Sequence, residues 1–206
     1  MRQHRYEGSR KRGLEALALV KLQVSDPDGP RDEPSGRLTV ALSDGQAQHV
    51  GRSEVTVDEI EAARKVVPIA TVQNLYNLAD RKSEAVLEYC EANNLGFIPW
   101  FPLAAGSLAD PGGPLATAAK THGVAPGAVA LAWLLHRSPV MLPIPGTSSV
   151  AHLEENMTGG ALALSAEELE ALSWCLGCNT VRARFWTLNS CGVRKGAPRP
   201  ARARPR

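Results

Sequence analysis

The sequence predicts an α/β fold built on a parallel β-sheet, and two observations support this. In the stretch 67–106 an amphipathic helical segment lies between two short apolar runs, the pattern of strand, helix and strand. The same alternation continues along the chain and gives about five strands, each but the last followed by a helix. Strands that alternate with helices pair in parallel through right-handed crossovers.

The strands are recognised as short runs bounded by Gly, Pro or polar residues. Residues 25–35 hold three prolines and five charged side chains, and this composition is typical of a loop. In a parallel sheet the ligand site lies beyond the carboxyl ends of the strands. The ends of the two strands in 67–106 are QNLYN and WFPLAAG, and both carry groups that a nucleotide can use. The expected strands are 17–24, 48–53, 69–73, 97–101 and 140–144.

Capping and breaking residues mark the helix boundaries. Thr56 with Glu59, and Ser165 with Glu168, fit the capping box of a helix start. Proline is favoured in the first turn of a helix and glycine just after its end. We therefore expect a helix end at 7–12, and helices at 37–42, 57–66, 82–93, 114–121, 126–136, from the turn 145–149 to 156, and 165–174.

Charge is unevenly distributed along the chain. Residues 13–170 carry ten basic and twenty acidic side chains, whereas residues 171–206 carry eight basic and no acidic ones. A basic tail can contact nucleic acid, but this one lacks interleaved aromatic residues, which favours a solvated tail without such a partner. We expect residues 1–174 to form one domain and 175–206 to be a basic, disordered tail.

Several classes of protein are not indicated. No run of about 18 apolar residues predicts a membrane-spanning helix. The basic N-terminus lacks the apolar segment of a secretory signal, so we expect a cytoplasmic protein. Cys175 and Cys178 form a lone C-x-x-C, but no histidine follows His152 and the pair falls at a helix end, so no metal or redox site is expected.

Three ordered motifs carry a family resemblance: QNLYN at 73–77, IPWFPLAAG at 98–106 and LPIPGTSSVAHLEEN at 142–156. They resemble the aldo/keto reductases, which are NADP(H)-dependent reductases of small carbonyl compounds on a (β/α)₈ TIM barrel. The resemblance covers roughly residues 6–172 and only the second half of that family. It implies an incomplete barrel made of about the last five strands, since a whole one takes about 250 residues.

The resemblance implies that NADP is the cofactor, with NAD not excluded. Gln73 matches the family's ligand for the nicotinamide carboxamide, and a Gln side chain offers both a donor and an acceptor. The family's G-x-S-N motif reads Gly51-Arg52-Ser53-Glu54 here, and the Glu adds charge beside the cofactor ring. Without the resemblance, ordinary polar strand ends and a core tryptophan at 100 would be the better explanation of these residues. The implied cofactor-binding residues are Ser53, Gln73, Trp100, Phe101, Leu103, Gly106, Thr147, Ser148, His152, Glu155 and Asn156.

Phosphates are expected at two of these segments. The loop 101–106 is small enough for backbone N–H groups to approach a pyrophosphate. The helix that begins near Ser149 offers free N–H groups and its dipole, although a plain helix cap would look the same. The family often places Lys or Arg at the positions of Gly146, Ser148 or His152, and none stands there.

No catalytic residue is predicted. Carbonyl reduction needs a proton donor, which in the family is a Tyr supported by Lys, Asp and His. The strands that carry Asp, Tyr and Lys would lie upstream of Tyr6, and Gln23 occupies the family's His position. We therefore expect a chain that retains cofactor-site residues and is inactive or impaired alone. The alternatives are an oxidoreductase completed by a partner chain, a non-native truncated product, and self-association through exposed strand edges.

Overall fold

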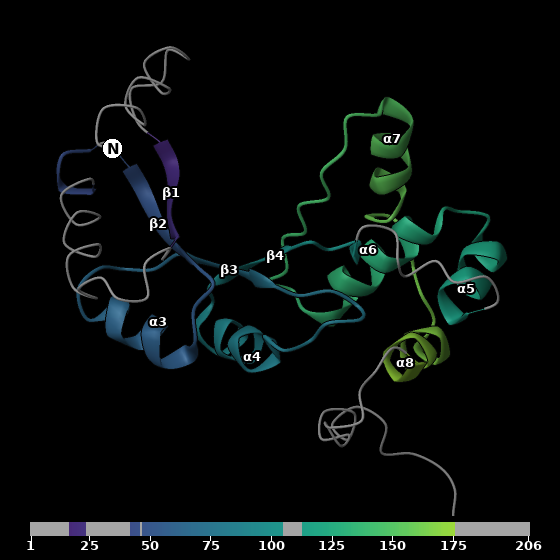
Figure 1. The fold of residues 1–206 in the computed structure, drawn as a ribbon, viewed down its shortest axis with the longest axis horizontal. Coiled ribbons are helices and arrows are strands. Elements are labelled where there is room, and N and C mark those ends of the chain that lie inside the picture. The colour runs from purple at the N-terminus through teal and green to yellow at the C-terminus, as the bar shows by residue number, and fades with distance from the viewer. Residues whose placement is uncertain (1–16, 24–41, 46, 105–112, 176–206) are drawn as a thin grey trace, which may run out of the picture.

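The computed structural model describes residues 17–23, 42–45, 47–104 and 113–175, which form one parallel sheet with flanking helices (Figure 1). The strand order is β1-β2-β3-β4, so each strand pairs with the next in the sequence. This order and the parallel pairing confirm the predicted α/β class. The strands are β1 Leu17–Gln23, β2 Ala47–Ser53, β3 Thr71–Leu75 and β4 Gly96–Trp100.

The strand expected at 140–144 is reduced to a single bridge. Phe97 pairs in parallel with Met141, and the Phe97 N–H donates to the Val140 carbonyl at 2.8 Å. Continuing this ladder requires an N–H from Pro99, which proline lacks. The pairing therefore ends after one bridge, and Leu142 and Ile144 remain 54% and 47% exposed.

The helices begin where their capping residues predict. Thr56 and Glu59 form the expected reciprocal box at the start of α3, and Ser165 and Glu168 bond each other's N–H groups before α8. Of the helix expected at 37–42 only Leu42 lies within the described residues, and the helix end at 7–12 lies outside them. The helices are α3 Val57–Arg64, α4 Glu84–Asn93, α5 Pro114–His122, α6 Pro126–Arg137, α7 Val150–Thr158 and α8 Ala166–Cys175.

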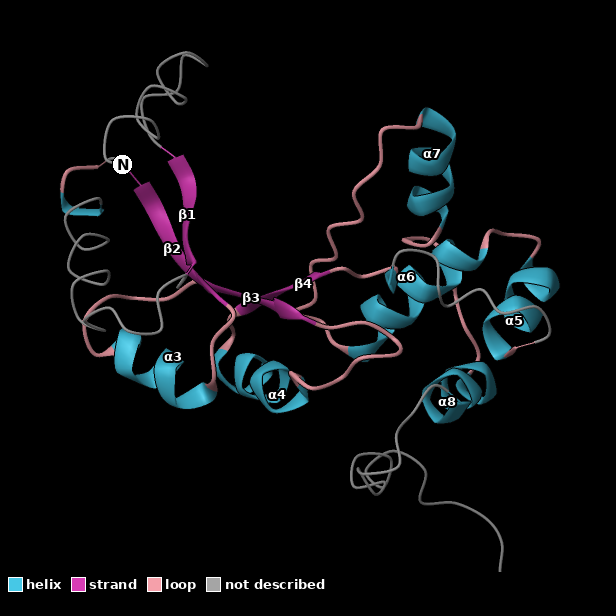
Figure 2. Ribbon diagram, in the orientation of Figure 1, coloured by secondary structure: helices cyan, strands magenta, loops and turns pink. Residues whose placement is uncertain are grey.

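One face of the sheet is buried and the other is partly open. Val50, Val72 and Phe97 alternate with their neighbours on the buried face and have no exposed surface. Figure 2 shows α3 and α4 together on one side of the sheet. On the opposite face of β3, residues 71, 73 and 75 are only half-buried. Gln73 on β3, and Ser53, which pairs with it from β2, therefore project from the more accessible face.

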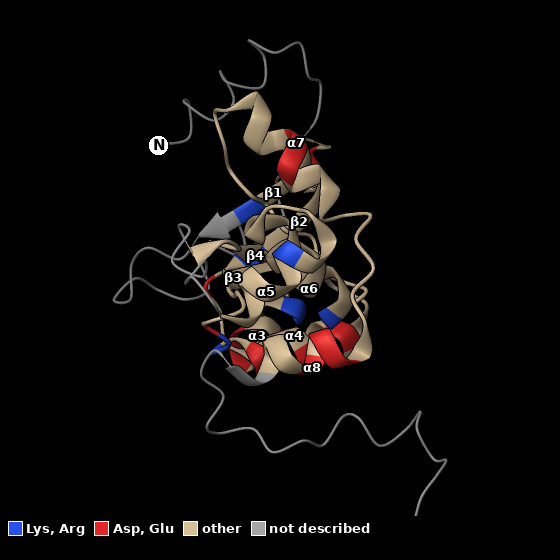
Figure 3. Ribbon diagram, turned by 90° about the vertical axis from the view of Figure 1, so that its right-hand side faces the viewer, with Lys and Arg blue, Asp and Glu red and all other residues tan. Residues whose placement is uncertain are grey.

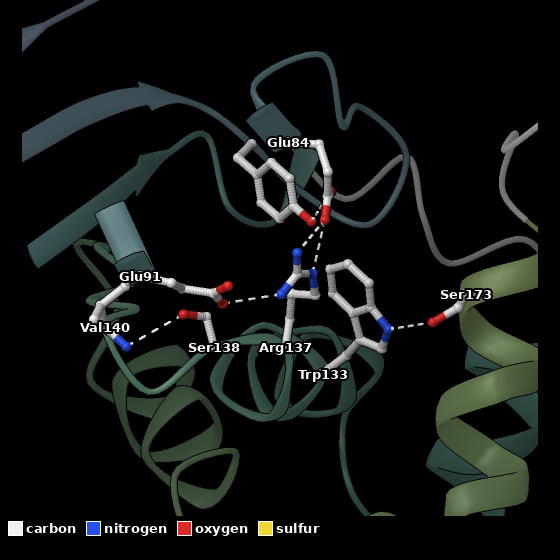
Figure 4. A network of polar contacts seen from close by, with 8 residues as sticks. Glu84, Glu91, Trp133, Arg137, Ser138, Val140 and Ser173 are labelled. Atoms are coloured by element: carbon white, nitrogen blue, oxygen red, sulfur yellow. Dashed lines mark hydrogen bonds and ion pairs between the residues drawn. The ribbon is translucent and has the colours of Figure 1, made fainter. Parts of the chain in front are cut away.

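A half-buried polar network joins α4, α6 and the segment after β3 (Figure 4). The Arg137 Nε donates to Glu84 at 2.8 Å, and its Nη1 donates to Glu91 at 3.0 Å. The Tyr76 hydroxyl donates to the other Glu84 oxygen at 2.6 Å. Burial would lower the pKa of Arg137, but the hydrogen bond and charge of Glu84 outweigh it and raise that pKa. The network fixes the chain leaving β3 against the helical layer.

Helix α7 differs from the others because it buries none of its residues. Val150, Leu153 and Met157, spaced along one helical face, are 71%, 51% and 70% exposed. Within the described part of the chain, no helix is long and apolar enough to span a membrane.

Candidate functional site

The carboxyl ends of the strands bring the predicted site residues into one row. Gln23 on β1 stands opposite Ser53 on β2, and Ser53 stands opposite Gln73 on β3. One pleat further along, Leu75 on β3 stands opposite Trp100 on β4. The structure therefore brings together three residues predicted from different parts of the sequence, namely Ser53, Gln73 and Trp100.

The Gln73 side chain on β3 accepts a hydrogen bond from a residue on β1, which lies on the other side of β2. The Lys21 ammonium on β1 donates to Gln73 Oε1, which leaves the Gln73 Nε2 group available as a donor. The lysine side chain crosses β2 at Gly51, where an added Cβ would lie 2.9 Å from Lys21 Cγ and 2.4 Å from Thr71 Oγ1. The glycine is required because any side chain at 51 would block this crossing.

The segment after Ser53 stays attached to β3 beyond the end of β2. The Glu54 N–H donates to the Gln73 carbonyl at 2.9 Å. The buried Asn74 side chain accepts from the Val55 N–H at 3.1 Å and donates to the Val55 carbonyl at 2.8 Å. These bonds hold Ser53, which is 6% exposed, in a fixed position beside Gln73.

The loop after β4 is held in an uncommon conformation. Phe101 and Ala104 have φ values of 59° and 47°, in the left-handed region that non-glycine residues seldom adopt. The Asn77 side chain, 2% exposed, donates to the Phe101 carbonyl at 3.1 Å and accepts from Ala79 and Asp80 at 2.9 Å. Asn77 therefore links the chain after β3 to the loop after Trp100.

A second group of predicted residues converges on α6. A Cβ added to Gly127 would lie 3.7 Å from Leu103 Cδ2 and 3.8 Å from Asn156 Oδ1. Leu103 from the β4 loop and Asn156 from α7 thus approach the same glycine. This proximity is expected if both border one elongated ligand.

The N-terminus of α7 is partly capped by its own side chains. Ser149 Oγ accepts from the His152 N–H at 3.4 Å, and Thr147 Oγ1 accepts from the Ser149 N–H at 3.1 Å. The side chains predicted to reach a phosphate or adenine here, Thr147, Ser148, His152 and Glu155, are exposed. In Figure 3 the ribbon of α7 and α8 carries red segments, which mark Asp and Glu, and the sequence from 138 to 175 holds no Lys or Arg.

Some predictions fall outside the described residues. Gly106, Cys178 and the tail 176–206 lie there, and so the expected pyrophosphate contact, the expectation that the C-x-x-C pair has no metal or redox role, and the expected disorder stay predictions. For Gln23 the structure supports a statement only about the backbone, which ends β1 opposite Ser53. In the described part of the chain, no three His, Cys, Asp or Glu side chains group to hold a metal ion.

Comparison with known proteins settles the family. The model described as "Aldo/keto reductase family" matches residues 2–176. The chain belongs to the aldo/keto reductase family. An uncharacterized oxidoreductase of Schizosaccharomyces pombe is 46% identical over 167 residues, which are 81% of this chain and 55% of that protein. Pyridoxine 4-dehydrogenase of Escherichia coli is 40% identical over 173 residues, 81% of this chain and 60% of that protein.

Solved structures agree with this assignment. An aldo-keto reductase from Klebsiella pneumoniae in complex with NADPH superposes with a TM-score of 0.74 at 27% identity, covering 84% of this chain and 63% of that one. An aldo/keto reductase from Klebsiella pneumoniae in complex with NADP and acetate gives a TM-score of 0.72 at 27% identity, covering 81% of this chain and 61% of that one. The chain thus spans a little over half the length of these relatives, and its sheet is part of a (β/α)₈ barrel, as predicted.

Sequence reasoning missed residues that hold the site together. Lys21, Asn74 and Asn77 form hydrogen bonds with the predicted cofactor-binding residues or with the segments that carry them. Glu54 was predicted only to add charge beside the cofactor ring. Asn74 and Asn77 sit in QNLYN, where amides directly after a strand are a detectable signal for turn and loop contacts. Lys21 carried no such signal, because its reach depends on the packing of three strands.

Proposed function

We propose that the carboxyl edge of β2, β3 and β4 binds the nicotinamide end of NADP(H). The observation that supports this best is the register, which pairs Ser53 with Gln73 and Leu75 with Trp100. It places a hydroxyl, a carboxamide and an aromatic ring at adjacent strand ends. This donor set fits the cofactor, because a nicotinamide carboxamide needs in-plane hydrogen bonds and its ring needs an aromatic stacking surface.

The adenosine end is proposed to lie along α7, beside Leu103 and Asn156. The relatives solved with NADP or NADPH support NADP(H) as the cofactor. The α7 segment offers hydroxyls at Thr147 and Ser148 but no Lys or Arg. Because a 2′-phosphate gains most from Arg or Lys, we propose only a small preference for NADP(H) over NAD(H).

The parent activity is the reduction of a small aldehyde or ketone, in which the bound cofactor supplies hydride. The residues of this chain would orient the nicotinamide, but the reaction also needs a proton donor at the developing alkoxide. Gln23 occupies the family's His position, and a neutral amide does not transfer protons at ordinary pH. We propose that the chain alone binds cofactor and reduces carbonyl substrates poorly or not at all.

An equilibrium titration tests the binding. Tryptophan fluorescence of the full chain is recorded with increasing NADPH, and we expect saturable quenching. The Gln73→Leu variant should bind roughly 5- to 30-fold more weakly, since one or two hydrogen bonds are worth about 1–2 kcal/mol. His49→Gln, an exposed change at the opposite end of β2, is the matched control and should bind normally. Equal affinity of Gln73→Leu and wild type would exclude the proposed site.

Oxidation of NADPH, followed at 340 nm with a model aldehyde such as 4-nitrobenzaldehyde, tests the catalytic part. We expect no turnover above the level of the Gln73→Leu variant. Turnover that depends on Gln73 would show that this chain supplies its own proton donor, and the deficiency would be rejected.

A second candidate function is an oxidoreductase completed by a partner chain. The observation that favours it is a set of exposed apolar side chains on the segment after Met141 and on α7. A polypeptide made of the part of the Escherichia coli relative that this chain does not match is a suitable probe. Co-expression should give a stable complex with NADPH-dependent activity, whereas separate elution of the two polypeptides would reject this candidate. These exposed side chains are Leu142, Ile144, Val150, Leu153 and Met157.

A further inference from the structure

Glu54 follows the last residue of β2 and has a left-handed backbone, with φ of 53°. Longer side chains seldom adopt this conformation, whereas Asn, the residue of the family's G-x-S-N motif, adopts it more readily. An uncommon conformation persists when surrounding contacts over-determine it, and such positions gather at functional sites. The contacts of Glu54 therefore indicate what the conformation achieves.

Three strand ends meet at this one residue. Its N–H donates to the Gln73 carbonyl at 2.9 Å, and its Oε1 accepts from the Leu75 N–H, also at 2.9 Å. The same oxygen accepts from the Trp100 indole Nε1 on β4. A single carboxylate thus joins β2 to β3 through the backbone and to β4 through a side chain.

The bond from Trp100 to Glu54 restricts χ1 and χ2, the two side-chain torsions that orient the indole. Trp100 is half-buried, and the centroid of the Phe101 ring lies 6.1 Å from that of the indole, with 50° between the ring planes. Phe101 is 48% exposed and has a left-handed backbone of its own. Of these contacts, the charge-assisted bond to Glu54 is the directional one.

We propose that Glu54 is a positioning residue that holds the Trp100 indole across the ends of β2, β3 and β4, as the stacking surface for a nicotinamide ring. The last clause rests on the proposed cofactor site, whereas the bond itself does not. An Asn at 54 is one methylene shorter and cannot span both Leu75 and Trp100 in the same way. The Glu is therefore a feature of this chain's site and not a neutral replacement.

The indole N–H signals of the ligand-free full chain test the bond by two-dimensional ¹H–¹⁵N NMR. The Trp100→Phe variant assigns the Trp100 signal among those of the four tryptophans. In Glu54→Ala this signal should move upfield and exchange faster with solvent, because its acceptor is gone. Glu54→Gln keeps an acceptor at the same length and should keep the signal near its wild-type position, while Glu54→Asn should resemble Ala. An unmoved Trp100 signal in Glu54→Ala would overturn the proposal.

Cofactor binding separates the two levels of the inference. We expect Glu54→Ala to weaken NADPH binding about 3- to 10-fold in the wild-type background and by much less in Trp100→Phe, since the effect passes through the indole. Equal losses in both backgrounds would overturn the positioning role. If neither the wild type nor any variant binds NADPH, while the Trp100 indole signal still responds to substitution of Glu54, the proposed function is wrong but the hydrogen bond between Glu54 and Trp100 is confirmed. Glu54→Gln keeps the test valid if Glu54→Ala fails to fold.

Discussion

Replacing Arg137 by Met should destabilise the fold substantially. The substitution leaves Glu84 and Glu91 facing the space of the guanidinium, and these three side chains are only about a quarter exposed, at 25%, 24% and 28%. Removing one partner of a fully buried ion pair costs about 3–5 kcal/mol. Because about a quarter of the surface of these side chains is exposed to water, we expect the free energy of unfolding to fall by about 2–3 kcal/mol. For a chain of this size, that corresponds to a fall in melting temperature of roughly 5–10 °C.

Urea unfolding followed by circular dichroism measures this loss. The matched control is Arg64→Met, because Arg64 is exposed and donates to the neutral acceptors Tyr89 Oη and Asn93 Oδ1 at 2.8 and 2.6 Å. That change should cost less than about 1 kcal/mol. Adding Glu84→Gln and Glu91→Gln to Arg137→Met should recover part of the stability. A loss no larger than that of the control would refute the role given to the network.

Three further predictions concern titration, reactivity and cofactor choice. Burial, together with the charge and hydrogen bond of Glu84, raises the pKa of Tyr76. The protonated hydroxyl therefore stabilises the fold fully below the usual pKa of about 10, and this contribution is lost as the pH rises above it. Between pH 8 and pH 11 the free energy of unfolding of the wild type should therefore fall more than that of the reference variant Tyr76→Phe. Burial raises the pKa of the unexposed Cys90 thiol to about 12, so mass spectrometry should find Cys90 unalkylated at pH 8 and alkylated in urea, and rapid native alkylation would contradict its burial. His152→Arg should raise the NADPH-over-NADH affinity ratio roughly two- to five-fold, the worth of an exposed ion pair, and an unchanged ratio would place the 2′-phosphate elsewhere.

The parts of the fold that local chemistry specifies were predictable from the sequence. The capping boxes at Thr56 and Ser165 and the glycine at 123, with φ of 64°, gave the helix boundaries within about two residues, since their hydrogen bonds involve only neighbours in the chain. The row of Ser53, Gln73 and Trp100 followed from parallel strands ending at one edge.

The contacts between distant segments were not predictable in the same way. The strand expected at 140–144 does not extend beyond one bridge, because Pro99 on the neighbouring strand has no N–H to donate. This could be predicted only if the pairing of the two segments were already known. Lys21 reaches Gln73 only because Gly51 lies between them. Glu54 gained its contacts from a left-handed backbone that nothing in its sequence neighbourhood signals. Such features depend on the register between strands. The hydrophobic pattern indicates which face of a strand is buried, but not which residues of two strands stand opposite each other.

The most direct test of the cofactor site is a titration of the ¹⁵N-labelled full chain with NADP⁺, observed by NMR. The proposed site predicts that the signals of the Gln73 side-chain amide and the Trp100 indole shift together with the same saturation curve. The signal of the Trp133 indole, which donates to Ser173 on α8, should not shift. Saturable shifts elsewhere in the spectrum, with the Gln73 and Trp100 signals unmoved, would contradict it.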